Sequence, residues 1–159
     1  MSRIRAATVE DAAAIATMLH MKRLRYATYQ PTFWRVASDA LERHLPYLRE
    51  LIQRPDTIAL VAEGDDATLI GVVIATVVPA PPVYSPGGPT CAIDDFAVAD
   101  DEAWATTGQE LLARAVRKAK EDFGAAQAVV VCGQRDQPKR AMLQTGSYTV
   151  ASEWWTKPL

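Results

Sequence analysis

The sequence has little of what marks a secreted, membrane-spanning or nucleic-acid-binding protein. Its 159 residues carry 17 Lys and Arg against 19 Asp and Glu, a net charge of −2. A nucleic-acid module would usually be basic. No apolar run approaches the ~18 residues of a membrane span, and the charged, then amphipathic start, MSRIRAATVEDAAA, has no apolar signal-peptide segment. We therefore expect a cytoplasmic protein that binds neither membrane nor nucleic acid.

Cysteine and histidine are also scarce, with two of each. Cys91 and Cys132 lie inside apolar, strand-like runs, which is typical of reduced core residues. His20 and His44 are far apart and lack ligand spacing, so we expect no metal site. The remaining composition, 49% hydrophobic and 23% charged, is that of a globular protein. No repeat, biased tract or linker divides the chain, and a single domain over residues 1–159 is expected.

Apolar periodicity and turn residues predict strands and helices in a mixed order. A helix should begin after Thr8, where Asp11 completes a variant capping box, and end before Pro31. A second helix should follow Ser38. Later elements include a helix ending near Phe123 and a short one over residues 138–144. Strands are expected at residues 2–7, 58–63, 69–78, 91–98, 126–132 and 148–155.

The stretch Cys91–Phe123 organises this pattern, because it reads as a strand, a short loop and an amphipathic helix. With the strand at 126–132 it makes a βαβ unit, whose two strands should be parallel. The fold class is therefore α/β (α+β): a mixed, mainly antiparallel twisted sheet with a βαβ core and helices on both faces. The start of the helix would present backbone N–H groups and a positive dipole end to an anion.

The element order and the segment IDDFAV, Ile93–Val98, resemble the GNAT superfamily of N-acetyltransferases over nearly the whole chain. Many members carry hydrophobic–acid–acid–hydrophobic–x–Val on the fourth strand, followed by a Q/R-x-x-G-x-G/A loop. Counting on from Val98 places that loop at residues 103–108, and the family's next Leu-Leu falls on residues 111 and 112. Its three signature positions hold Ala103, Thr106 and Gly108, so one glycine is kept.

The resemblance implies acetyl-CoA as cosubstrate, with its pyrophosphate held by backbone N–H groups of this loop. Any residue except proline can supply such a group, and glycine would favour the turn through positive φ. Thr106 and Thr107 could bind phosphate through their hydroxyls or could cap a helix with nothing bound. The predicted cofactor-binding residues are Phe96, Val98, Ala103, Trp104, Ala105, Thr106, Thr107, Gly108 and Gln109.

The resemblance also places the chemistry on the strand over residues 91–98. In the family a backbone N–H at the Val98 position binds the thioester carbonyl, and an acid on this strand often serves as base. Asp94 and Asp95 are the catalytic candidates; side chains alternate along a strand, so one should face the site, and the register favours Asp94. Either carboxylate could equally pair with a nearby base or bind a cationic substrate. The family's usual proton donor, a tyrosine, is replaced by Met142, which cannot donate a proton.

The acceptor is expected near the first two helices and the loop before residue 91. Tyr26, Tyr29, Trp34 and Tyr84 are the predicted acceptor-binding residues, with packing as the alternative. Lys139 could meet a cofactor phosphate, although solvated surface charge is its default interpretation.

Together these features predict direct acetyl transfer, in a ternary complex, to a primary amine of a small molecule or a protein. The missing signature residues keep a second interpretation open, a catalytically impaired GNAT-fold binding or interaction module. A homodimer is a reasonable expectation for a small protein, and Trp154 or Trp155 in the last strand could lie at its contact.

Overall fold

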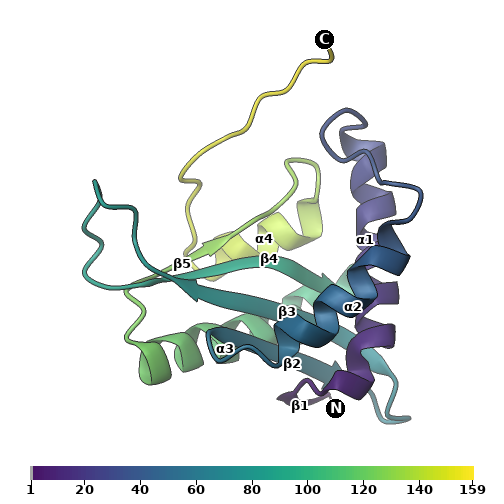
Figure 1. Ribbon diagram of the computed structural model, residues 1–159, viewed down its shortest axis with the longest axis horizontal. Helices are drawn as coiled ribbons and strands as arrows, with labels where there is room; N and C mark the ends of the chain where they lie inside the picture. Colours follow the sequence, from purple (N-terminus) through teal and green to yellow (C-terminus); the bar gives the residue numbers. More distant parts are fainter. Residues whose placement is uncertain (1) are drawn as a thin grey trace.

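A computed structural model describes residues 2–159 and shows one five-stranded sheet (Figure 1). Its strands lie side by side in chain order, with neighbours antiparallel from the first to the fourth and the last pair parallel. The strands are β1 (Arg3–Ala6), β2 (Thr57–Glu63), β3 (Leu69–Val78), β4 (Thr90–Val98) and β5 (Gln127–Val130). This mixed, mainly antiparallel sheet confirms the predicted fold class.

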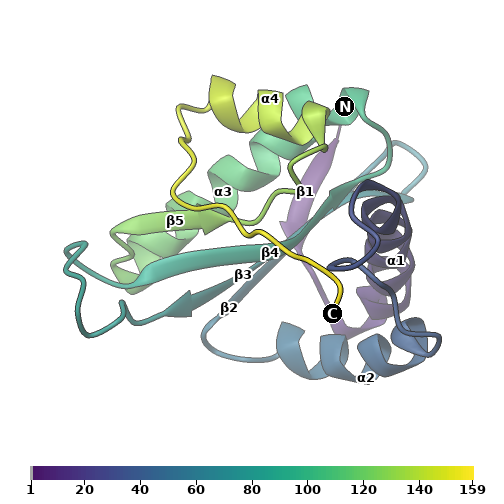
Figure 2. The ribbon, with the colours of Figure 1, turned by 90° about the horizontal axis from the view of Figure 1, so that it is seen from above.

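Helices cover both faces of the sheet, as Figure 2 shows. The α-helices are α1 (Ala12–Tyr29), α2 (Ala40–Ile52), α3 (Thr107–Phe123) and α4 (Gln137–Thr145), with short 3-10 helices η1 (Val9–Asp11) and η2 (Glu102–Ala105). One core cluster joins the sheet to α1 and α2 through Val61, Val72 and Ala97, and the other joins it to α3 and α4 through Leu60, Val73 and Phe96. Because β2 and β3 are covered on both faces, their sequences are nearly continuous apolar runs.

Local sequence explains most helix boundaries. The Asp11 carboxylate accepts a hydrogen bond from the Thr8 N–H at 2.7 Å, which confirms the predicted capping pair. α2 follows Asp39 rather than Ser38, and it continues through Pro46 as one helix. α3 ends at Phe123 and is capped by Gly124, whose φ of 68° lies in the left-handed region that favours glycine. Within the described residues 2–159, no helix combines the length and apolar composition that crossing a membrane requires.

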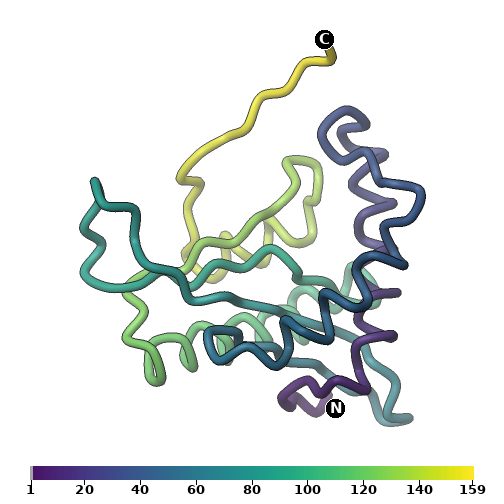
Figure 3. Tube along the Cα trace, in the orientation of Figure 1, coloured from purple at the N-terminus to yellow at the C-terminus, as the bar shows by residue number. Residues whose placement is uncertain are grey.

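The prediction of a last strand over residues 148–155 is wrong. After α4 the described chain contains neither helix nor strand, and it leads away from the sheet (Figure 3). Tyr148 still packs against the core, whereas Val150 and Trp154 are exposed. β-forming side chains make a strand only beside another strand, and no edge of this sheet pairs with the segment.

Candidate functional site

The centre of the site is the point where β4 and β5 separate. Their register pairs Thr90–Ile93 with Gln127–Val130, and the last bond runs from the Val131 N–H to the Ile93 carbonyl at 2.9 Å. Beyond Ile93 the second half of β4 continues beside β3 but has no strand on its other side. β5 ends at Val130 rather than at the predicted residue 132, because its pairing with β4 stops there.

A cleft of about 870 Å³ lies between α1 and the end of β4 and continues to η2. Its walls include the apolar end of β4, at Ala97 and Val98, and the ring of Trp104. Two basic side chains, Lys22 and Arg25, also line the cleft, and Arg25 forms an ion pair with Asp101. The cleft therefore joins the free half of β4 to the segment that precedes α3.

Asp94 and Asp95 do not follow the expected alternation, because β4 carries a bulge at this point. Val73 pairs with Phe96 and Ala75 pairs with Ile93, so both aspartates lie opposite Ile74. An extra residue of this kind re-aims side chains locally. Asp94 is exposed, and Asp95 is directed at α1 and α2. Asp95 is therefore the aspartate that contacts the two helices.

Asp95 is the anion of a charged cluster that sequence reasoning did not find. Its carboxylate lies 3.0 Å from Nη2 of Arg23 on α1 and 3.6 Å from Nε2 of His44 on α2. Burial works against the charged carboxylate, but His44 and Arg23 outweigh burial and keep the pKa of Asp95 below its ordinary value. The carboxylate is thus paired, as the alternative interpretation held, and a lowered pKa makes it a weak base.

Two lysines converge where the strands part. Nζ of Lys22 donates to the Asp94 carbonyl on β4 at 2.9 Å, and Nζ of Lys139 on α4 donates to the Val131 carbonyl at 2.8 Å. Lys139 is fully buried, with its ammonium over the rings of Phe96 and Trp104, so its interpretation as solvated surface charge is wrong. Burial lowers the pKa of both groups, and for Lys139 burial and the charge of Lys22 lower the pKa to about 7.

The predicted phosphate loop forms η2 and the first turn of α3. Residues 103–105 lie in η2, and Thr107, Gly108 and Gln109 begin α3. Trp104 is 5% exposed and packs edge-on against Phe96, whose side chain is wholly buried. A Cβ on Gly108 would lie 2.6 Å from the Trp104 ring, and the φ of Gly108 is not positive. The expectation that this glycine is needed for a positive φ is therefore wrong. Gly108 instead leaves room for the Trp104 ring.

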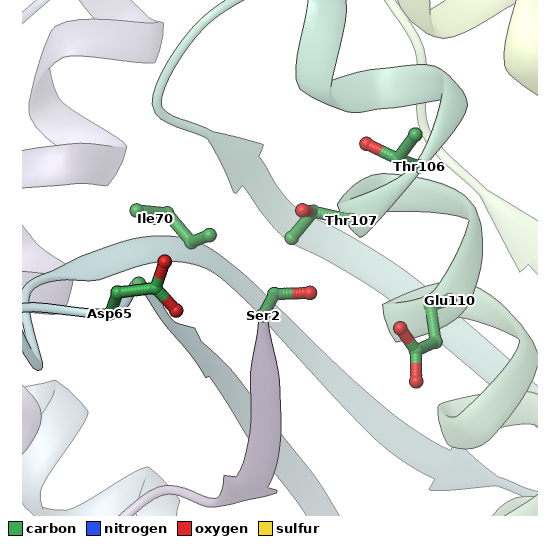
Figure 4. A pocket seen from close by; sticks show the side chains of 7 residues that line it. Ser2, Asp65, Ile70, Thr106, Thr107 and Glu110 are labelled. Carbon is green, nitrogen blue, oxygen red and sulfur yellow. The ribbon is translucent and has the colours of Figure 1, made fainter.

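The other side of the α3 N-terminus faces a hollow of about 520 Å³ (Figure 4). Thr106 and Thr107 line it together with two carboxylates, Asp65 and Glu110. Thr106 is exposed and Thr107 is buried. Carboxylates repel an anion, so Asp65 and Glu110 work against phosphate binding in this hollow.

The structure brings three of the four predicted acceptor residues together. Tyr26 packs against Tyr29 and Trp34, with ring centroids 5.6 and 5.1 Å apart. Tyr26 is 2% exposed; its Oη donates to Asp136 at 2.6 Å and accepts from the Gly133 N–H at 3.2 Å. Tyr84 is exposed on the β3–β4 loop, at the other end of the sheet from the α1–α2 loop. Tyr26 is therefore a buried part of the cleft lining. Tyr84 is remote from the other three predicted acceptor residues.

Solved structures with this architecture are acetyltransferases in several instances. The chain aligns with the tetramutant of the BH1408 protein from Bacillus halodurans at 14% identity and a TM-score of 0.84, covering 99% of each chain. A predicted acetyltransferase with acetyl-CoA from Clostridium acetobutylicum gives 15% identity and 0.77, covering 99% of this chain and 96% of that one. Ribosomal-protein-alanine N-acetyltransferase from Brucella melitensis biovar Abortus 2308 gives 19% and 0.67, with full coverage of both chains. At these identities the likeness shows the fold.

The class that the fold defines is thus a mixed α/β domain of the architecture seen in these acetyltransferase structures. Among curated proteins none matches the sequence significantly. The sequence profile of the acetyltransferase (GNAT) family matches residues 20–146. The chain belongs to the acetyltransferase (GNAT) family, which confirms the resemblance read from IDDFAV.

Proposed function

We propose that this protein is an N-acetyltransferase that moves an acetyl group from acetyl-CoA to a primary amine by direct attack in a ternary complex. The observation that carries the proposal is the parting of β4 from β5 after Ile93, beside a cleft of about 870 Å³. A strand edge without a neighbour offers N–H and C=O groups to an extended, amide-containing ligand. The pantetheine arm of acetyl-CoA is such a ligand.

Residues that line the cleft or follow its lining in the chain support the binding of acetyl-CoA at both of its ends. Backbone groups of Phe96 and Val98 would hold the arm, and the first amides of α3, at Thr107, Gly108 and Gln109, have no acceptor within the helix and suit a phosphate. Lys22 adds positive charge to the cleft wall. When bound, acetyl-CoA supplies an activated acyl group, and the chain supplies its position.

Asp94 is the residue we propose as the base. It is exposed at the β4 bulge, whereas Asp95 is held by Arg23 and His44. An amine acceptor arrives mainly as its ammonium form at neutral pH, so a nearby carboxylate both attracts it and can take its proton, directly or through water. The acceptor class, a small-molecule or protein amine, follows from this charge and from the family.

Thermal unfolding with and without CoA or acetyl-CoA tests the cofactor proposal. A ligand present at 100 times its Kd stabilises the folded state by ~2.7 kcal/mol, and the midpoint should rise accordingly. If millimolar acetyl-CoA leaves the midpoint unchanged, the proposed function fails. The same measurement with a nucleotide that lacks the pantetheine arm shows how much of any shift comes from β4.

A variant at the bulge tests the base. We expect Asp94→Asn to lower acetyl transfer about 10²-fold or more, in the range of general-base contributions, and to remove one ionisation from the pH profile. Asp122→Asn, on the solvent side of α3 and paired with Lys118, is the matched control and should leave the profile unchanged. An unaltered profile in Asp94→Asn would exclude Asp94 as the base.

The second candidate is a GNAT-fold module that binds without catalysis. It is favoured by the packing behind β4, where Trp104 and Lys139 fill space beside Phe96, and by Met142 at the position of the usual proton donor. A thermal shift with CoA, combined with no acetyl transfer to any member of a broad amine panel, would support this candidate. Turnover of acetyl-CoA with any amine would reject it.

A further inference from the structure

Lys22 places a primary amine inside the cleft, at the point where β4 and β5 part. Its side chain lines the cleft, and its Nζ donates to the Asp94 carbonyl at 2.9 Å and lies 5.3 Å from the centre of the Tyr26 ring. These two contacts, one with β4 and one with its own helix α1, hold the end of a flexible side chain in one place. The negative charge of Asp94, the residue that we propose as the base, acts on the same amine. A primary amine and the proposed base therefore lie in one part of the site.

The surroundings of this amine favour the form that can react. Only a neutral amine has the lone pair that attacks a carbonyl carbon. Burial is the largest influence on the pKa of Lys22 and lowers it, and Arg23 acts in the same direction. Three carboxylates oppose the lowering, those of Asp94, Asp95 and Asp136. The pKa of Lys22 stays below the ordinary value, so its neutral fraction exceeds that of an exposed lysine at the same pH.

The other lysines lack one of these two properties. Lys139 has a lowered pKa, but it is fully buried and is not among the residues that line the cleft. Lys118, Lys120 and Lys157 are exposed to solvent and do not line the cleft either. Within residues 2–159, Lys22 is therefore the lysine that combines a place in the cleft lining with a lowered pKa.

We propose that Lys22 is a self-acetylation site, whose Nζ takes the acetyl group from acetyl-CoA in the cleft when no amine acceptor is present. This inference rests on the proposed function, because it requires that cosubstrate. With its phosphate end at the start of α3, a pantetheine arm that lies along Phe96 and Val98 points its acyl end back along β4 toward Asp94. Nζ of Lys22 is hydrogen-bonded at that end of the free half of β4.

The reaction balances without a further reactant. The lone pair of the neutral amine attacks the thioester carbonyl carbon, an N–C bond forms, and the C–S bond breaks with its electron pair on sulfur. The proton that the nitrogen loses passes to the sulfur of CoA, directly or through Asp94 or water. The products are an acetylated lysine and free CoA. Because the resulting amide is not nucleophilic, each chain reacts once at Lys22.

Incubation of the purified full chain with acetyl-CoA, in the absence of an acceptor, tests the inference. Mass spectrometry of the intact chain should show the gain of one acetyl group, and peptide mapping should place that group on Lys22. Because both reactants lie in one complex, Lys22 should react at least about tenfold faster than the exposed Lys120. The rate should saturate with acetyl-CoA and should not depend on protein concentration. Equal rates at Lys22 and Lys120, as in random chemical acetylation, would overturn the inference.

Arginine variants provide a matched pair. Lys22→Arg keeps the positive charge, but its guanidinium stays protonated and does not attack a thioester. This variant should lose the fast acetylation, whereas Lys120→Arg, changed at an exposed position on α3, should react like the natural protein. A Lys22→Arg chain that gains one acetyl group at the natural rate would contradict the assignment to Lys22.

Thermal unfolding measured in parallel separates this inference from the proposed function. If acetyl-CoA raises the midpoint of unfolding while Lys22 remains unmodified, self-acetylation is wrong and the proposed function is unaffected. If acetyl-CoA neither raises the midpoint nor modifies the chain, both fail. A raised midpoint together with acetylation of Lys22 supports both.

Discussion

Gly108 shows how a residue can fit a motif for a different physical reason. The family's loop has a glycine here, yet in this chain the space above its Cα is occupied by the Trp104 ring, 2.6 Å from where a Cβ would lie. The ring is held in turn by Phe96 and by the ammonium of Lys139. The absence of a side chain at position 108 therefore supports the packing between η2 and α4.

We predict that Gly108→Ala destabilises the protein by about 1–3 kcal/mol, the usual cost of overpacking a filled site. The same substitution should cost much less in a Trp104→Leu background, where the ring is gone. Urea unfolding of the four proteins gives the coupling free energy between the two positions. Equal costs in both backgrounds would show that Gly108 serves the backbone rather than the ring.

Lys139 should make stability depend on pH. Burial lowers its pKa to about 7 in the folded state, against about 10.4 for an unfolded lysine. Between these values the unfolded chain binds more protons than the folded one, so the free energy of unfolding rises with pH across this window. Lys22, Asp94, Asp136 and Cys132 are the ionisable neighbours that act on this group.

We therefore predict that Lys139→Met flattens this dependence. From pH 7.5 to 9.5 the natural protein should gain about 2–3 kcal/mol relative to the variant, at most ~1.4 kcal/mol per pH unit. Chemical unfolding at several pH values measures the difference. Lys120→Met, at an exposed position on α3, is the control and should run parallel to the natural protein. Parallel curves for Lys139→Met would mean that Lys139 titrates normally.

At the scale of elements, periodicity predicted most of the fold. The strand over residues 69–78 has the predicted bounds, and α3 ends at Phe123 as predicted. Their apolar patterns are long, and their ends are marked by turn residues or by Gly124. The bulge at Asp94 was not predictable, since it arises from pairing with β3 rather than from local sequence. The error over residues 148–155 has a related cause, because a strand needs an edge and the sequence does not say which edge is free.

The site was less predictable from the sequence than the fold, because its charged residues come from elements that are far apart in the chain. Lys22 and Lys139 meet only where β4 and β5 part, and Arg23 and His44 meet at Asp95 from two helices. No spacing in the sequence connects these pairs. One signal was available: Tyr26 lies at a three- or four-residue interval from Lys22 and Tyr29, which places all three near one side of α1.

Tyr26 joins two elements across the cleft, and its hydroxyl can be tested. Tyr26→Phe removes the bonds to Asp136 and to the Gly133 N–H, leaving buried groups at the start of α4 without that partner. We expect a loss of about 1–3 kcal/mol of unfolding free energy and faster amide exchange in α4. Tyr29→Phe removes a hydroxyl from a partly exposed ring on the same helix and should change stability by less than about 0.5 kcal/mol.

At the scale of the whole molecule, the folded body is separable from the C-terminal arm, residues 149–159. Both core clusters are built from residues between Ile4 and Tyr148, and the family profile ends at residue 146. In residues 149–159, Trp154 packs edge-on against Phe33 of the body, and the side chains of Val150, Trp154 and Trp155 are exposed. The body should therefore fold without the arm.

This separation predicts that removing the arm leaves the stability of the body nearly unchanged. The chain shortened after Tyr148 should unfold with a midpoint that does not depend on protein concentration. Its m-value should be nearly that of the full chain, because the arm buries little surface area. The full chain should match it within about 0.5 kcal/mol in the free energy of unfolding. A shortened chain that is markedly less stable at every concentration would show that the arm belongs to the core of its own molecule.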